Sequence, residues 1–473
     1  MMNILRIQAA LVLVTILCSA SAYGLPVIPG GVGFGIDTVA GRGGTIYRVT
    51  NLAASGPGSL QECVTASGPR TCVFEVSGTI RLTDDLAIYN PNLTIAGQTA
   101  PAPGIMIRGS ALGIYTSDVL VQHITIRAGD DPIGYDADTR DALKIGSPPN
   151  KSIQNIVVDH CSVSWGLDEN LDVFGTFDNI TLSNNLVSEP LHNSLVNDGT
   201  QPQGYNSLVG AARGRIFYIN NLFAHSIDRN PLSNAEDFVF VNNVVYNRKY
   251  RAVYIDNNYG LITRNSIVGN VFVEGPDYVN GSGPVYIAGE VQFSPSWLHP
   301  GTLLGTKVYV ADNASGRTTS DSWSVVTNTT KYSRSDLESS GPSAWPAGLM
   351  PMSTANDRVL DHVIGNAGSR PAQRSAVDAR VVTDVRNGTG KIINCVSSDG
   401  SSRCSKNGGG WPQLAQNTRV LNLPADPNGD DDGDGYTNLE EWLHSFAAEV
   451  EGGVSAVDSS PKRPNPPTLQ PAQ

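Results

Sequence analysis

The chain has 473 residues, 40% of them hydrophobic, and a formal net charge of −12 at pH 7. This length allows two or three average domains or one long β architecture. An acidic chain lacks the clustered lysine and arginine that general binding to nucleic acid or to an anionic membrane requires. An anionic ligand would therefore need a local cation, either carried by the protein or recruited by it.

Residues 1–22 have the organisation of a secretory signal peptide. Arg6 precedes an apolar run over residues 7–17, and Ala20-Ser21-Ala22 provides a small-residue cleavage site. The apolar run is too short to span a bilayer. The sequence therefore predicts a secreted, extracellular protein whose mature chain begins at about Tyr23.

The next segment predicts a helix followed by strands. Residues 60–68 (LQECVTASG) indicate a short helix that caps the N-terminal end of a core, and the strands begin with residues 74–82 (FEVSGTIRL). In an oxidising compartment the cysteine spacing suits two local disulfides, Cys63–Cys72 and Cys395–Cys404. Cys161 is left over, as either a reactive or a buried thiol.

A repeat dominates the middle of the chain. Seven short apolar runs begin at Leu93, Val119, Ile156, Ile180, Ile216, Phe238 and Leu261. From the second run on, positions five and six read His123-Ile124, His160-Cys161, Asn184-Asn185, Asn220-Asn221, Asn242-Asn243 and Asn265-Ser266. Polar residues at one register of an apolar β pattern, with a period in the low twenties, are typical of a β-solenoid with an asparagine ladder.

The stretch Asp159-His160-Cys161-Ser162 admits a catalytic interpretation and a structural one. A nucleophilic cysteine needs an activating base and an exposed setting. Because His160 and Cys161 fall at ladder positions, the repeat favours a ladder histidine and a buried thiol.

Two of the repeat intervals are longer than the others by at least ten residues, which predicts loops at 127–155 and 188–215. Such insertions leave a solenoid on one face, usually the binding face. Asp141, Asp168 and Asp172 fall beside these loops, with Glu169 and Asn170 close by. Gathered carboxylates suit a hard cation such as calcium, although a solvated acidic loop would have the same composition.

Arg229 stands in the segment AHSIDRNPLSN, residues 224–234, just after the rungs at Asn220 and Asn221. Pro231 stiffens the turn that follows. The arginine–proline pair is a weak motif by itself, because a surface arginine paired with Asp228 would also explain it.

The last third of the chain is predicted to be loop-rich after about Asn313, with a helix within residues 374–388. Residues 430–441 match the EF-hand loop, with ligands at Asp430, Asp432, Asp434, Tyr436 (carbonyl), Asn438 and Glu441. We therefore expect a β-solenoid domain over 23–425 and a calcium loop with its helix over 426–450. Residues 451–473 are Pro-rich and predicted to be disordered.

Several segments together resemble the pectate lyases of polysaccharide lyase family 1. Residues 41–62 and 68–80 are similar to the family's N-terminal segment, and residues 366–390 to a C-terminal segment of bacterial and fungal members. VDHCSVSWGLDENLDV (158–173) resembles its Asp-His strand and calcium loop, and DRNPLSN its catalytic arginine motif. The resemblance implies a right-handed parallel β-helix and calcium-dependent β-elimination on polygalacturonate.

The resemblance also implies roles for individual residues. Asp141, Asp168 and Asp172 match the catalytic calcium ligands, whereas a further aspartate of the family is Thr139 here, with Asp138 beside it. Arg229 matches the catalytic base. Asn234 replaces a second arginine that contacts a substrate carboxylate, and His192 falls where many relatives have a substrate-binding lysine.

Two rivals remain at this point. A polygalacturonase-like hydrolase shares the fold, and the pair Asp130-Asp131 would fit its paired carboxylates, but its other motifs are absent. A non-catalytic glycan-binding β-solenoid would explain the ladder and the loops. We further expect a monomer that binds pectin, with sequons such as Asn92, Asn179 and Asn387 glycosylated only in a eukaryotic secretory route.

Overall fold

The computed structural model describes residues 24–196, 200–257, 259–279, 281–294 and 297–452. The predicted signal peptide at 1–22 and the Pro-rich segment from residue 453 on lie outside the described residues. None of the helices in the described ranges has the length and apolar character needed to cross a bilayer.

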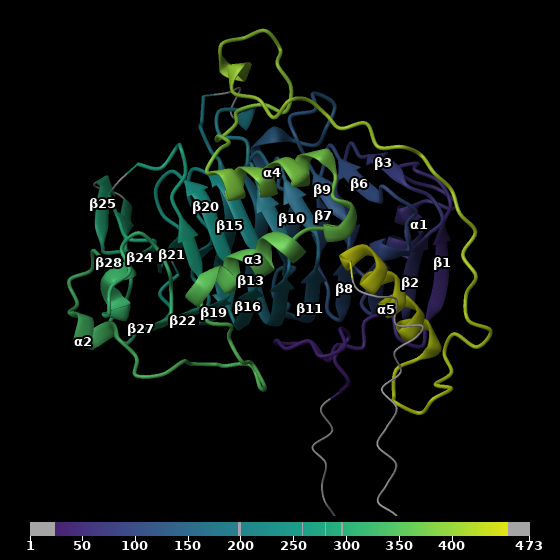
Figure 1. Cartoon of the computed structure of the whole chain (residues 1–473), viewed down its shortest axis with the longest axis horizontal. Coiled ribbons are helices and arrows are strands. Elements are labelled where there is room, and N and C mark those ends of the chain that lie inside the picture. Colours follow the sequence, from purple (N-terminus) through teal and green to yellow (C-terminus); the bar gives the residue numbers. More distant parts are fainter. Residues whose placement is uncertain (1–23, 197–199, 258, 280, 295–296, 453–473) are drawn as a thin grey trace, which may run out of the picture.

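Most of the described chain winds into a parallel β-helix, as predicted (Figure 1). Most turns of the coil add one strand to each of three parallel stacks, which we name A, B and C. The strand β13 (Glu169–Ser183) is long enough to take part in both stack A and stack B.

Stack A contains β1 (Thr45–Val49), β2 (Arg70–Phe74), β5 (Leu93–Ala96), β8 (Val119–Gln122), β11 (Ile153–Asp159), the second half of β13, β16 (Arg215–Ile219), β19 (Asp237–Val241), β22 (Arg264–Val268) and β27 (Lys307–Ala311). Stack B contains β4 (Leu86–Ile88), β7 (Leu112–Ile114), β10 (Leu143–Gly146), the first half of β13, β15 (Tyr205–Arg213), β18 (Leu232–Ser233), β21 (Val253–Ile255), β24 (Val285–Ile287) and β28 (Val326–Asn328). Stack C contains β3 (Gly78–Arg81), β6 (Ile105–Arg108), β9 (Thr125–Arg127), β12 (Ser162–Ser164), β14 (Leu186–Ser188), β17 (Leu222–Ser226), β20 (Val244–Arg248) and β23 (Val271–Val273). An antiparallel pair, β25 (Val291–Ser294) and β26 (Trp297–His299), stands apart from the stacks.

The apolar runs set the register of stack A. The predicted run starts from Leu93 to Phe238 pair with one another from strand to strand and are fully buried in one core. Burial of aligned aliphatic side chains at about 25 cal/mol per Å² fixes this register, because a slip by one residue would turn the same side chains to solvent. The seventh run is predicted wrongly: β22 begins at Arg264, not at Leu261, and Asn265 pairs with Phe238.

The asparagine ladder is present, and it extends further than the sequence indicated. The backbone N–H of each rung donates to the side-chain oxygen of the next, from Cys161 through Asn185, Asn221 and Asn243 to Asn270 and Asn313, at 2.8–3.0 Å. Asn270 and Asn313 therefore replace the predicted Ser266 rung. The preceding fifth-position residues are not rungs: from His123 to Asn242 they turn the chain with a left-handed φ of 47–57°.

Helices lie at both ends and along one side of the coil (Figure 1). They are α1 (Leu60–Thr65), α2 (Arg334–Leu337), α3 (Arg358–Asn366), α4 (Ala376–Asn387) and α5 (Asn438–Glu451). The buried side chains of α1 join the main core beside β1 and β2, as expected of a cap. Valine side chains of α3 and α4 pack on stack C, and α4 confirms the helix predicted within 374–388 (Figure 1).

The two predicted long loops each contain a strand of stack B, β10 in the first and β15 in the second. The additional residues lie at 128–142 and 189–204. Both pairs of predicted disulfide cysteines are bonded, with Cα atoms 5.9 Å apart in Cys63–Cys72 and 5.3 Å apart in Cys395–Cys404.

Candidate active site

Four carboxylates lie together where the chain enters the neighbouring strands β10 and β13. Asp141 comes just before β10, whereas Asp168, Glu169 and Asp172 belong to the turn into β13 and its first residues. The two strands are parallel neighbours, with Lys144 paired opposite Asp172. Carboxylate oxygens of Asp141, Asp168 and Glu169 all lie within 4.8 Å of one another.

The charges of this carboxylate cluster are poorly compensated by protein groups alone. Burial first, and then the neighbouring carboxylates, raise the pKa of Asp141, raise that of Asp172 to about 7 and raise that of Glu169 to about 8. Burial also raises the pKa of Asp168. Lys144 opposes these shifts only in part, because its Nζ donates to Asp85 at 2.9 Å.

One oxygen in the cluster has no hydrogen-bond partner. Asp172 Oδ1 is inaccessible to solvent and unpaired among the described residues. A buried, unpaired carboxylate oxygen is costly. An oxygen-rich, anionic donor set with one unsatisfied oxygen fits a hard cation such as calcium.

Arg229 lies beside the carboxylate cluster. It follows β17 in the turn that leads to β18, and its Nη1 contacts the carboxylate of Glu169. Its guanidinium also stacks on the ring of Tyr205 at 3.9 Å from the centroid. Burial by itself would lower the pKa of Arg229, but Glu169 raises it overall, so the guanidinium is held in its protonated form.

The alternative pairing of Arg229 with Asp228 is not the main contact of either side chain. The Oδ2 atom of Asp228 accepts from Arg251, whereas its Oδ1 accepts the backbone N–H of Arg229, at 2.9 Å. The guanidinium of Arg229 is therefore directed at Glu169 and Tyr205.

A basic pocket contains His192. It is lined by His192 together with Lys249 and Lys406, and by Ile227, two residues before Arg229. His192 Nδ1 lies 2.6 Å from the carbonyl oxygen of Gln203, and burial lowers the pKa of its imidazole. The two lysines were not predicted, since nothing in their local sequence marks them.

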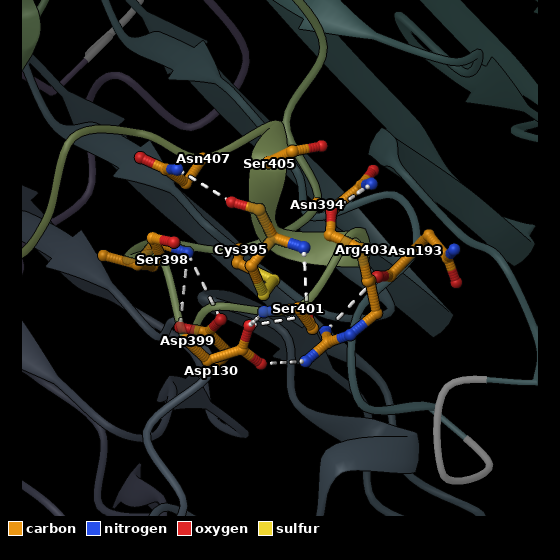
Figure 2. Close-up of a disulfide and its surroundings, with 12 residues drawn as sticks. Asp130, Asn193, Asn394, Cys395, Ser398, Asp399, Ser401, Arg403, Ser405 and Asn407 are labelled. Carbon is orange, nitrogen blue, oxygen red and sulfur yellow. Dashed lines mark hydrogen bonds and ion pairs between the residues drawn. A yellow bond between two sulfur atoms is a disulfide. The ribbon is translucent and has the colours of Figure 1, made fainter.

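A segment of the C-terminal region ties the two inserted loops together (Figure 2). His192 N–H donates to the carbonyl of Ile393, and Val396 N–H donates to the Asp130 carboxylate. Arg403, within the loop closed by Cys395–Cys404, donates to the carbonyl of Asn193 at 3.3 Å. The disulfide-closed loop thus supports the wall of the basic pocket.

Aromatic side chains border the carboxylate cluster on stack B. Tyr115 follows β7 and stacks on Tyr89 with centroids 5.3 Å apart, and Tyr89 is 66% exposed. Phe174 of β13 meets Tyr259 edge to face at 6.0 Å, and both rings are partly exposed. Such surfaces can stack against apolar faces of sugar rings.

The sequence departs from the family motifs at Asn234, expected to contact substrate, and at Thr139, which stands where the family has a calcium-site aspartate. Asn234 is 2% exposed, and its backbone N–H donates to the carbonyl of Val209, which does not fit a residue that contacts a polymer. Thr139 is exposed in a short 3₁₀ turn, and the adjacent Asp138 is close enough to raise the pKa of Asp168.

The Asp130-Asp131 pair is not arranged as a catalytic acid and base. Arg81 and Arg108 both hold the carboxylate of Asp131, and their pairing lowers its pKa although burial would raise it. Asp130 accepts the Val396 N–H. Both carboxylates therefore have structural partners, and the pair no longer supports the hydrolase interpretation.

The predicted EF-hand loop folds with its aspartates together. Oxygens of Asp430, Asp432 and Asp434 lie within 4.8 Å of one another, and Gly435 takes the left-handed φ of 99° that the sharp turn at the sixth position needs. Burial and then these aspartates raise the pKa of Glu441. Calcium binding here stays a prediction, as does the role of Tyr436 and Asn438.

Curated relatives match this chain over most of its length. A probable pectate lyase C from Aspergillus terreus is 31% identical over 467 residues, covering 93% of this chain and 99% of the relative. A probable pectate lyase C from Aspergillus flavus is 30% identical over 443 residues, covering 89% and 94%. A Bacillus subtilis pectate lyase structure aligns with a TM-score of 0.47 at 14% identity, covering 73% of this chain and 98% of that one. No family model matches the sequence.

Proposed function

The chain belongs to the pectate lyase family, and from this premise we propose that it is a secreted, calcium-dependent lyase that cleaves polygalacturonate by β-elimination. The products would be 4,5-unsaturated oligogalacturonates. The observation that carries the proposal is the contact between Arg229 and Glu169, which puts a guanidinium against a cluster of four buried or half-buried carboxylates, one oxygen of which is unpaired among the described residues.

The chemistry requires both parts of this site. The proton on C5 of galacturonate is α to a carboxylate, and it is weakly acidic because the anion resists a second negative charge. Asp141, Asp168, Glu169 and Asp172 are the residues that would hold calcium, which neutralises the substrate carboxylate and stabilises developing negative charge when bound. In its neutral form, Arg229 would accept the C5 proton; the C4–C5 double bond would form as the C4–O bond breaks, and the leaving oxygen would take a proton from solvent.

Glu169 and Tyr205 give Arg229 its position. Ion pairing on one side and ring stacking on the other hold the guanidinium in one place, as a base must be held near the proton that it removes. The same ion pair keeps Arg229 protonated, so an arginine base requires alkaline conditions. We therefore expect turnover to rise with pH above neutrality.

The basic pocket supplies a site for further galacturonate carboxylates. Lys249, Lys406 and His192 line it together with Asp277 and with Ile227, which lies two residues before Arg229. In an acidic protein, the two lysines would meet an anionic polymer locally. They would make the contact with a substrate carboxylate that the sequence assigned to position 234.

The direct test measures product chemistry. We expect purified protein incubated with polygalacturonate in calcium to generate the ultraviolet absorbance of a carbon–carbon double bond conjugated with the carboxylate. The absorbance should stop rising when chelator is added and resume with excess calcium. New reducing ends without this absorbance would indicate a hydrolase, and neither signal would indicate a binding module.

The thiol of Cys161 supports a second prediction. Burial raises its pKa to about 12, and its Sγ lies 3.5 Å from the carbonyl oxygen of Asp159, so the thiolate needed for nucleophilic attack is not populated. We expect Cys161→Ser to keep kcat within about twofold while losing about 1–2 kcal/mol of stability. Steady-state kinetics and thermal unfolding would measure both. A thousandfold loss of kcat in a folded variant would contradict the structural role.

A further inference from the structure

A second group of potential metal ligands lies away from the active site, where α5 meets stack A. His123 follows β8, and Asp159 and His160 come at the end of β11. Glu451 is the last residue of α5. One ligand atom from each of these four side chains lies within 4.8 Å of every other.

Two of the ligand separations are close to those of a small four-coordinate ion, whereas His160 Nδ1 and Asp159 Oδ2 are at hydrogen-bond distance. His123 Nε2 lies 3.2 Å from Glu451 Oε1, and His160 Nδ1 lies 3.5 Å from the same oxygen and 2.8 Å from Asp159 Oδ2. Ligands bound tetrahedrally at the zinc bond lengths of about 2.0–2.2 Å are separated by about 3.3–3.6 Å. Small side-chain movements would therefore complete the coordination.

The hydrogen bonding of His123 fixes which of its nitrogens is available. Its Nδ1 lies 2.7 Å from the carbonyl oxygen of Ser369, which can only accept, so Nδ1 carries the proton. Its Nε2 is inaccessible to solvent, has no hydrogen-bond partner among the described residues, and faces the Glu451 carboxylate. A ring that donates from one nitrogen to a carbonyl and presents the other to a metal is the usual arrangement of a metal-bound histidine.

Asp159 and His160 are also held in position by neighbouring side chains. Asp159 accepts from Ser183 Oγ at 2.7 Å and from Asn184 Nδ2 at 3.0 Å, so its carboxylate is fixed. The rings of His123 and His160 are parallel, with centroids 5.1 Å apart. Two imidazoles and two carboxylates neutralise a divalent charge, and this mixed nitrogen and oxygen set favours zinc over calcium, which prefers oxygen alone.

We infer that His123, Asp159, His160 and Glu451 form a structural transition-metal site, occupied by zinc or a similar divalent ion, that fastens α5 to the coil. The ion joins strand ends near residues 123 and 160 to a helix whose ligand, Glu451, lies 328 residues after His123 and 291 after His160. Because α5 begins directly in the EF-hand-like loop, both ends of this helix would carry a metal.

The test uses full-length protein freed of metal with chelator and then saturated with calcium, so that the oxygen-only sites are filled. Zinc is titrated with equilibrium dialysis and thermal unfolding as readouts, and cobalt is used as a visible probe. The variant is Glu451→Gln, which keeps the size of the side chain at a partly exposed helix end. Glu449→Gln, an exposed position on the same helix, is the matched control.

We expect the wild type and Glu449→Gln to bind one zinc ion, to melt at higher temperature with it, and to give the intense visible bands of four-coordinate cobalt. Glu451→Gln should lose at least about tenfold in zinc affinity, together with the cobalt bands. Equal zinc binding in Glu451→Gln, or no zinc-dependent stabilisation of the wild type, would overturn the inference and leave a plain histidine–carboxylate ion pair. No readout depends on lyase turnover.

Discussion

Arg229→Lys is expected to bind calcium and oligogalacturonate nearly as well as the wild type but to lose about 10²–10⁴-fold in kcat, the usual contribution of a general base. Lysine preserves the positive charge opposite Glu169, so the buried carboxylate keeps a counterion. The planar guanidinium, stacked on Tyr205, is what places a nitrogen at the substrate. The loss should therefore fall on the transition state rather than on substrate binding.

The measurement is steady-state kinetics on polygalacturonate, with circular dichroism to confirm folding. Arg215→Lys is a suitable control, because Arg215 is also ion-paired, with Asp178, and lies over the ring of Phe34, but it belongs to stack A. The control should retain its kcat. A value for Arg229→Lys above about a tenth of the wild type, equivalent to less than about 1.4 kcal/mol of barrier, would move the base elsewhere, with His192 the next residue to test.

Asp172→Asn is expected to raise the calcium concentration needed for half-maximal turnover by at least about tenfold, or about 1.4 kcal/mol of binding free energy. The amide keeps the shape of the side chain but removes one ligand charge and the unpaired carboxylate oxygen. Asp430→Asn, the matched change in the EF-hand-like loop, should leave this requirement unchanged. An equal effect of both substitutions would show that turnover does not depend on Asp172 as a ligand.

The same variant tests the pH dependence of stability. Burial and Asp168 raise the pKa of Asp172 to about 7, while Lys144 and Arg229 oppose the shift. Without calcium, the folded state then binds protons more tightly than the unfolded chain, whose aspartate pKa is about 3.9. The free energy of unfolding should therefore fall as pH rises from about 4 to about 7 and level off above that.

Asp172→Asn lacks this titration. At pH 8 without calcium it should melt above the wild type, and in saturating calcium below it, because calcium stabilises the protein that it binds more tightly. Melting temperatures across pH, with and without calcium, measure this reversal. A wild type whose stability rose between pH 4 and 7 without calcium would contradict the description of the carboxylate cluster.

The prediction from sequence was accurate where the information is local and repeated. The apolar runs from Leu93 to Phe238 gave the correct register, because burying aligned side chains admits one pairing. The predicted strand start at Leu261 was wrong, because the apolar residues there lie in the connection that precedes β22. The repeat also missed the rung at Asn270, because the sixth position counted from Leu261 falls on Ser266, and the rung at Asn313, because 43 residues separate it from Asn270.

Within the candidate site, the sequence identified the aspartates and Arg229 but not how they meet. Asp168 and Asp172 are marked by their position at a strand entrance, and Arg229 by its motif. The importance of Glu169 appears only with its contact to Arg229, 60 residues further along the chain. For Asn234 the structure argues against the predicted role. Its place in the motif suggested a contact with substrate, but its side chain is buried.

The sequence by itself therefore determined the coil, the ladder, the disulfide pairs and the residue types of the carboxylate cluster, because each follows from a short repeat, a local spacing or a motif. Only the tertiary structure decided which side chains lie together: Lys406 with His192 in the basic pocket, and Glu451 with His123 beside α5. The physical reason is that stacking of successive turns brings distant residues to one wall, and the loops and helices that return to that wall are positioned by packing rather than by any local pattern.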